Sequence, residues 1–277
     1  MLKLKTSLAA SALVVLTCVG AVPAKASVLV TYVSGKGNDS GNCSSPANPC
    51  RTFQFAVNQT AAGGEVKALD PADYRPVTTN KSISITGVDG AGIDTNGGNA
   101  ITLSIESGAI NLANLIIQNV SGSGTNGILN AVTPSFPFPS FSLTITHCTV
   151  RGFNTGIDLV GGAIRFLIAD TVVTNNQTGI ALDRALGTLD HVIANLNQDG
   201  VFADRGTITA VDTIASYNSG AGFTAGLGAS LLLARSTATT GVLISGGSVI
   251  SFGDNHIHNN GTDVNPASGT LTNVGTQ

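Results

Sequence analysis

The feature that most constrains the fold is a repeat in the second half of the chain. Each copy holds short runs of β-branched and other apolar residues, then polar residues that include asparagine, then a glycine followed by an apolar residue. A regular period of roughly 22 residues is typical of a solenoid or an array. The interval between neighbouring repeat glycines varies by only a few positions, and these glycines are Gly156, Gly179, Gly200, Gly222, Gly241 and Gly261.

The pattern inside each copy separates the architectures that share this period. Apolar residues alternate over short segments such as 143–145 and 208–211, which is the periodicity of a strand. No copy carries an apolar stripe at helical spacing, the leucine-rich repeat motif is absent, and a propeller blade needs about twice the length. We therefore predict an all-β fold, a parallel β-helix whose coils lie about 4.8 Å apart.

The N-terminal segment 1–26 has the order of a secretory signal. Lys3 and Lys5 precede an apolar stretch over 6–22, and Ala24-Lys25-Ala26 follows, so cleavage is expected after Ala26. A retained anchor is the alternative, but the stretch is short for a spanning helix. We expect a secreted or periplasmic protein with no membrane span after cleavage.

Four segments follow from this reading. They are the signal (1–26), an N-terminal strand, disulfide loop and capping helix (27–76), the β-helix coils (77–262) and a loosely attached C-terminal tail (263–277). Within the second segment, Leu29–Val33 is predicted as a strand and Thr52–Thr60 as a helix with Thr52 as N-cap. A helix laid across the open end of a solenoid would protect its unpaired strand edge.

The cysteines indicate the redox environment of the protein, and the lysines limit the kinds of partner that it can bind. Cys43 and Cys50 lie close together in a turn-rich segment, and export favours a disulfide between them, while Cys148 is predicted to be a buried thiol. No lysine follows Lys81. Since polyanion binding needs clustered Lys and Arg, nucleic acid is excluded as a partner. The sequence indicates no oligomeric state.

Four segments carry a recognisable pattern: residues 32–39 (YVSGKGND), 49–57 (PCRTFQFAV), 63–66 (GGEV) and 251–260 (SFGDNHIHNN). They resemble the signatures of secreted bacterial right-handed β-helix repeat proteins of the pectin-lyase-like superfamily. The resemblance implies a right-handed parallel β-helix but no particular activity, because the superfamily includes lyases, hydrolases, epimerases, adhesins and members without enzymatic function.

The catalytic motifs of that superfamily are missing. The Asp-Asp, Gly-His-Gly and Arg-x-Lys motifs of polygalacturonases and the Arg-x-Pro-x-x-Arg of pectate lyases are absent, and Asp70-Pro71 is followed by Ala72 rather than His. A non-catalytic exported solenoid that binds a polysaccharide or cell-surface glycan, or has a structural role at the cell surface, is therefore favoured. The alternative is a polysaccharide lyase acting on an acidic glycan.

Stacked coils turn equivalent positions into columns. One predicted column holds His147, Asp170, Asp190, Asp212, Arg235 and Asp254. Carboxylates about 5 Å apart repel by roughly 0.8–3 kcal/mol, so calcium bound by Asp170, Asp190 and Asp212 is one interpretation. A solvated column of turn residues is the other.

Two further columns are predicted. Asp183-Arg184 over Asp204-Arg205 forms an ion-pair ladder, structural or catalytic, and Asn175, Asn195, Asn218 and Asn259 form an asparagine ladder. The candidate catalytic residues of the lyase alternative are Asp170, Asp190, Asp212, Arg184, Arg205 and Arg235.

An insertion makes the coil between Gly127 and Gly156 longer than the coils that follow it. It carries Phe136, Phe138 and Phe141 on a proline-rich loop. Long coils project loops that often bind ligands, so these rings are candidates for sugar contact. The alternative is a flap packed against the solenoid.

Overall fold

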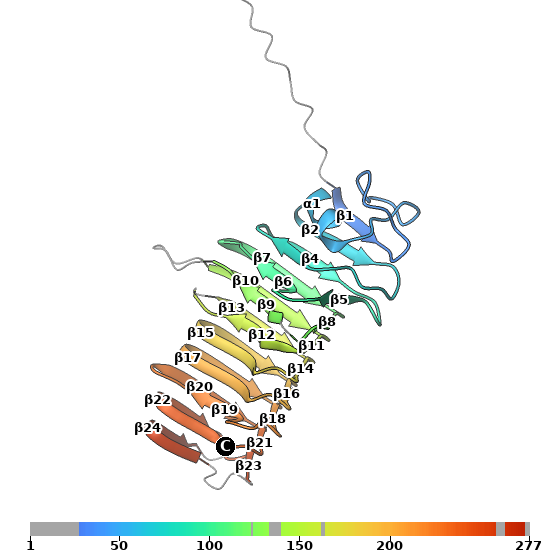
Figure 1. Cartoon of the computed structure of the whole chain (residues 1–277). Helices are drawn as coiled ribbons and strands as arrows, with labels where there is room; N and C mark the ends of the chain where they lie inside the picture. The colour runs from blue at the N-terminus through green and yellow to red at the C-terminus, as the bar shows by residue number, and fades with distance from the viewer. Residues whose placement is uncertain (1–27, 123, 133–139, 162–163, 259–263, 275–277) are drawn as a thin grey trace, which may run out of the picture.

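The computed structural model describes residues 28–122, 124–132, 140–161, 164–258 and 264–274. The predicted signal segment, residues 1–26, lies outside them. Figure 1 shows an elongated stack of parallel strands with a helix at its N-terminal end. This is the predicted β-helix. None of the described residues belongs to a helix with the length and apolar character needed to cross a membrane.

The N-terminal cap has the predicted helix and disulfide. Helix α1 (Phe53–Gln59) begins after Thr52, whose side-chain oxygen accepts a hydrogen bond from the N–H of Phe55. The helix buries Phe53, Ala56 and Val57, and Cys43 is bonded to Cys50. Hence the amphipathic pattern of this segment predicted both the helix and the side that packs on the solenoid.

The coils begin earlier and end later than the sequence indicated. Strand β1 (Val28–Val33) pairs in parallel with β2 (Thr60–Ala68), which the sequence did not predict, and β2 pairs with β4 (Ile83–Thr86). At the other end, β24 (Val264–Asn273) pairs with β22 (Val242–Ser251). The description of residues 263–277 as a loose tail is therefore wrong for 264–273, whose backbone extends the stack.

Each coil contributes to three faces. The first face is formed by β1, β2, β4, β7 (Ser107–Ala113), β10 (Ser140–Thr146), β13 (Arg165–Ala169), β20 (Ala229–Ala234) and the second parts of β15 (Thr178–Asp190), β17 (Asp199–Val211), β22 and β24. The third face is formed by β3 (Val77–Thr79), β6 (Ile101–Leu103), β9 (Gly124–Asn130), β12 (Phe153–Leu159), β19 (Phe223–Ala225) and the first parts of the same long strands.

The second face is a separate sheet, with eight short strands in the described part of the chain. In coil order these are β5 (Gly92–Thr95), β8 (Ile116–Asn119), β11 (Thr149–Arg151), β14 (Val172–Thr174), β16 (Ile193–Asn195), β18 (Ile214–Ala215), β21 (Thr237–Ala238) and β23 (His256–Ile257). All pair in parallel, so a residue on this face lies beside its counterpart one coil away.

The core follows from this register. On the first face, a fully buried row runs through Ile145, Ile168, Leu189, Ala210 and Leu233. Burying an aliphatic side chain of this size stabilises by roughly 1.5–3 kcal/mol relative to exposure. Cys148 is also buried, as predicted, and burial raises the pKa of its thiol to about 11, which makes it a poor metal ligand.

An asparagine ladder runs along the edge at which the strands of the second face end. The side-chain oxygens of Asn197 and Asn218 accept hydrogen bonds of 2.9 Å from the N–H groups of Asn176 and Asn197, one coil earlier. Their amides donate to the carbonyls of Val173 and Ala194. A ladder was predicted with Asn218 as a member, but Asn176 and Asn197 take the places assigned to Asn175 and Asn195. Asn259 lies outside the described residues.

Candidate functional site: the exposed edge and the second face

A single-residue bend joins the first face to the second in successive coils. The bend residue has a positive φ, between 47° and 55°, and is in turn Asn114, His147, Asp170, His191, Asp212 and Arg235. Asparagine, aspartate and histidine adopt this conformation more readily than other non-glycine residues. The backbone conformation thus explains the residue type at five of these six positions. We call the six positions together the exposed edge.

The predicted alignment of His147, Asp170, Asp212 and Arg235 is confirmed, and two members are corrected. Asp190 pairs with Ala169 and Val211, so it lies one residue before the bend and His191 occupies the bend itself. Asp254 lies one residue after the bend, where its carboxylate accepts a hydrogen bond from the N–H of Arg235 at 2.9 Å. The edge therefore alternates histidine with aspartate instead of stacking carboxylates.

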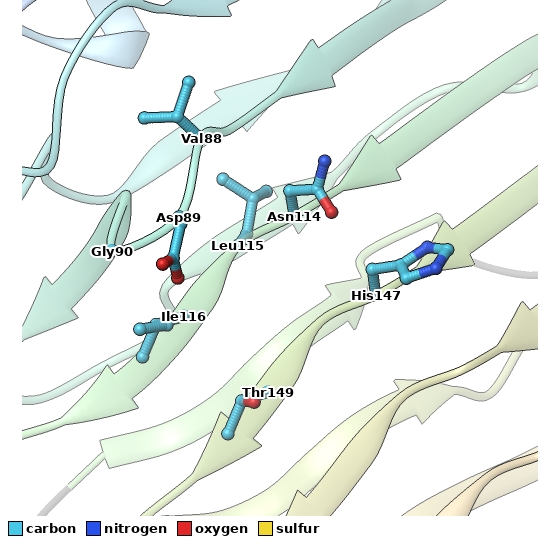
Figure 2. Close-up of a pocket in the computed structure, with 8 residues that line it drawn as sticks. All are labelled: Val88, Asp89, Gly90, Asn114, Leu115, Ile116, His147 and Thr149. Carbon is cyan, nitrogen blue, oxygen red and sulfur yellow. The ribbon is translucent and has the colours of Figure 1, made fainter.

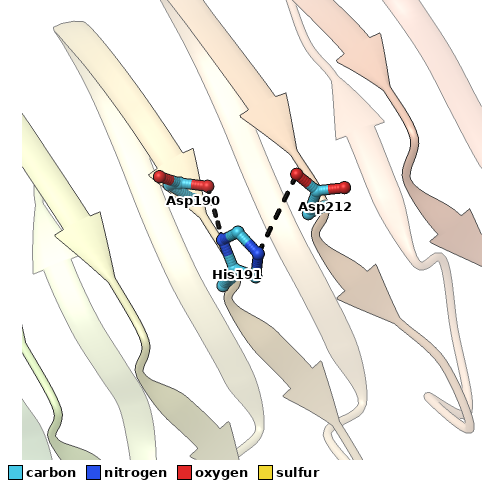
Figure 3. A group of neighbouring side chains, drawn as sticks. All are labelled: Asp190, His191 and Asp212. Atoms are coloured by element: carbon cyan, nitrogen blue, oxygen red, sulfur yellow. Dashed lines mark hydrogen bonds and ion pairs between the residues drawn. The ribbon is translucent and has the colours of Figure 1, made fainter.

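Histidine and carboxylate side chains meet on this edge (Figure 3). The Nδ1 atom of His191 lies 2.7 Å from Oδ1 of Asp190, and its Nε2 atom lies 4.0 Å from Oδ2 of Asp212. The Asp212 carboxylate also pairs with Arg235 through Nε at 2.9 Å and Nη2 at 2.8 Å. Hydrogen bonding from Arg235 holds the pKa of Asp212 below its ordinary value, and Asp212 in turn raises the pKa of Arg235.

Two of the three predicted calcium ligands come together: one ligand atom each of Asp190, Asp212 and the intervening His191 all lie within 4.8 Å of one another. Calcium takes six to eight oxygen ligands. The imidazole of His191 lies between the carboxylates of Asp190 and Asp212, and Arg235 forms an ion pair with Asp212. Oδ2 of Asp170 lies 3.8 Å from Nε2 of His147. The three carboxylates therefore do not form an all-oxygen cage by themselves, because an imidazole and a guanidinium group lie among them, and calcium binding here stays a prediction.

Arg184 and Arg205 lie on a different edge, between the third face and the first. As predicted, Asp183 stacks on Asp204. The Asp183 side chain is only 8% exposed and lies 2.7 Å from Nε of Arg205 and 3.2 Å from Nη1 of Arg184. Six residues of strand, roughly 20 Å, separate Arg184 from Asp190. The six candidate catalytic residues therefore belong to two distant edges and do not form one active site.

The phenylalanine loop is only partly described. Phe136 and Phe138 lie outside the described residues. Phe141 belongs to β10, pairs with Gly108 and is 2% exposed. Its predicted role in ligand contact is wrong, because a ring packed in the core cannot reach a sugar.

A hollow of about 410 Å³ lies at the N-terminal end of the exposed edge (Figure 2). Three coils supply its walls, and the lining residues are Val88, Asp89, Gly90, Asn114, Leu115, Ile116, His147 and Thr149. Asn114 and His147 belong to the exposed edge, while Ile116 and Thr149 start strands of the second face. The hollow is therefore continuous with both surfaces.

The second face presents apolar side chains that the sequence analysis did not single out. An outward row of paired positions runs from Ile116 through Thr149, Val172 and Ile193 to Ile214. All are partly exposed. This row lies two residues after the exposed edge, so a strip that is aliphatic except for Thr149 runs beside a polar and mostly ionisable one.

Two bulky residues border the far side of this face. Leu196 and Tyr217 are 55% and 74% exposed, and each has a positive φ, 54° and 56°. Large side chains rarely adopt this conformation, and such strain is concentrated at functional sites. The sequence held a usable signal, because each residue directly precedes a ladder asparagine where a polar residue is expected.

Comparison with known proteins identifies a similar fold but no family to which the chain belongs. No protein-family model and no curated protein matches the chain. Among solved structures, the crystal structure of pectate lyase Pel9A matches with a TM-score of 0.60 and 15% sequence identity, over 91% of this chain and 78% of that one. The protein thus has the pectin-lyase-like fold, a right-handed parallel β-helix with a short N-terminal capping helix.

Proposed function

We propose that the protein is an exported carbohydrate-binding solenoid that holds an extended polysaccharide against its second face. The observation that carries this proposal is the combination of surfaces on that face. A partly exposed aliphatic row lies between the polar exposed edge and the projecting Leu196 and Tyr217.

These surfaces suit the chemistry of a sugar chain. A pyranose ring has apolar C–H faces and a rim of hydroxyl groups, so it needs apolar contacts beside hydrogen-bonding groups. Ile193 and Ile214 would supply the first, and His191 and Asp212 would supply the second. Because the outward row and the polar edge continue from coil to coil at about 4.8 Å, a ligand built from repeated units would be recognised. Exposed apolar surface rimmed by polar residues marks a binding site more often than a bare surface does.

The ion pairs of Arg205 and Arg235 favour a binding function over lyase chemistry. A lyase needs a base that can accept a proton from the substrate. The guanidinium groups of Arg205 and Arg235 are each ion-paired with carboxylates, and Asp212 raises the pKa of Arg235 further. Neither is available as a base in this arrangement. The order of residues 1–26 and the Cys43–Cys50 disulfide support export.

Affinity electrophoresis against neutral and uronate polysaccharides tests the proposal. We expect retardation by at least one polymer, with binding weakened about tenfold, or 1.4 kcal/mol, by Tyr217→Asn or Ile214→Thr. Leu186→Thr is the matched control, because Leu186 is a comparably exposed aliphatic residue on the first face. Retardation that is lost in the Leu186 variant and kept in the other two would contradict the proposal. Release of unsaturated sugars, followed by ultraviolet absorbance, would favour the lyase alternative.

A further inference from the structure

The hydrogen bond between His191 and Asp190 fixes the tautomer of the neutral imidazole. The Nδ1 atom lies 2.7 Å from Oδ1 of Asp190. An ionised carboxylate can only accept, so Nδ1 carries the hydrogen. In the neutral ring, Nε2 is then left with a lone pair.

That lone pair faces a second acceptor. Nε2 of His191 lies 4.0 Å from Oδ2 of Asp212, which is too far for a hydrogen bond. Two electron-rich atoms turned toward each other across such a gap are stabilised by a cation between them. Ligands held tetrahedrally at about 2.1 Å from a metal ion are roughly 3.4 Å apart. The two atoms would need to approach by roughly 0.6 Å, a small movement for side chains exposed by 62% and 28%.

We propose that Asp190, His191 and Asp212 form a surface site for a divalent transition metal of the zinc class. Nε2 of His191 and a carboxylate oxygen of Asp212 are the protein ligands, and water completes the coordination. Asp190 is a positioning residue, since a carboxylate on the second ring nitrogen orients a metal-binding histidine and makes it more basic. Imidazole nitrogen suits zinc, copper and nickel, whereas calcium and magnesium prefer oxygen ligands alone.

Arg235 opposes the metal without excluding it. Its guanidinium binds both oxygens of Asp212, but each oxygen of a carboxylate can accept more than one partner. The positive charge of Arg235 lowers the affinity for a cation at the same carboxylate. Removing that charge should therefore tighten metal binding.

The neighbouring coils contain an incomplete copy of the site. His147 Nε2 lies 3.8 Å from Oδ2 of Asp170, nearly the spacing of His191 and Asp212. The residue before the bend is Thr146 in that coil, where His191 has Asp190. His147 therefore lacks the positioning carboxylate and provides a matched control within the same chain.

Isothermal titration of the full chain with zinc chloride at neutral pH tests the site. We expect one zinc ion to bind in preference to calcium, His191→Asn to abolish binding, and Asp190→Asn to weaken it by about 10- to 100-fold. His147→Asn should leave the affinity unchanged, and Arg235→Gln should increase it. Asparagine is chosen because it tolerates the left-handed bend.

Electron paramagnetic resonance with copper(II) supplies a readout independent of affinity. The spectrum of the wild type should show coupling to one imidazole nitrogen, and His191→Asn should remove it. An absence of zinc binding by the wild type would overturn the proposal. So would zinc binding that survives in His191→Asn or is lost in His147→Asn.

Discussion

The two edges of the second face are built alike and differ in what their polar side chains contact. On the exposed edge, His191 and Asp212 are turned toward each other and toward solvent. On the opposite edge, the side chain of Asn197 is 4% exposed and bonds twice to the main chain of the preceding coil. Stacking alone therefore does not identify a binding site. A column whose hydrogen bonds end on backbone holds the coils together, and a column with facing, exposed groups can take a ligand.

Asn197→Ala should cause the largest loss of stability. The substitution removes the acceptor of the Asn176 N–H and one donor to the carbonyl of Val173 in the buried ladder. Each unsatisfied buried group costs about 1–3 kcal/mol, so we expect a loss of about 2–5 kcal/mol in urea unfolding. His191→Asn on the exposed edge should change stability by less than about 0.5 kcal/mol. Equal losses for the two variants would remove the distinction between the edges.

Asp183→Asn should have an intermediate effect. It removes the charge that lies between Arg184 and Arg205 and is itself nearly buried. Because both guanidinium groups are partly exposed, solvent screens much of the interaction, and we expect a loss of about 1–2 kcal/mol. Asp204→Asn is the control, since Asp204 is more exposed and, among the described residues, forms an ion pair with Arg205 alone. A larger effect at Asp204 than at Asp183 would show that burial does not rank these ion pairs.

Lowering the pH should reduce the stability contributed by a carboxylate that accepts a main-chain hydrogen bond more than the stability contributed by a carboxylate on the exposed edge. Burial raises the pKa of Asp70, but hydrogen bonds from the Gly35 N–H, Ser34 and Tyr74 outweigh it and leave this pKa below its ordinary value of 3.8. A lowered pKa stabilises the fold above the ordinary value and ceases to do so as pH falls through the folded value. Thermal unfolding should therefore show Asp70→Asn less stable than the wild type at neutral pH, with the difference shrinking below about pH 4. Asp212→Asn should show a smaller change with pH, and a pH-independent Asp70→Asn difference would contradict this reasoning.

Tyr217→Asn should change stability only slightly, and in the opposite direction. A bulky residue with positive φ is strained, and asparagine relieves the strain, so we expect a gain of up to about 1 kcal/mol. The same change should weaken polysaccharide binding. A stabilised variant with unchanged binding would show that the strain at Tyr217 serves another purpose.

The repeat period predicted the fold and much of the exposed edge, but not its exact membership. Coils vary in length by a few positions, so aligning acidic residues by type placed Asp190 where the strand register places His191. The same variation in coil length is why the asparagine ladder was predicted at Asn175 and Asn195, one and two residues before its actual members Asn176 and Asn197. Phe141 was assigned to a loop because the sequence does not reveal where an insertion rejoins a strand. Helix α1 was predicted closely because Thr52 supplies an explicit N-cap.

A crystal structure with a bound oligosaccharide from the best polymer of the panel tests the central claim most directly. Our account predicts sugar density along the second face, over Ile193 and Ile214 and between His191 and Tyr217. Sugar on the first or third face, with the second face bare, would contradict it.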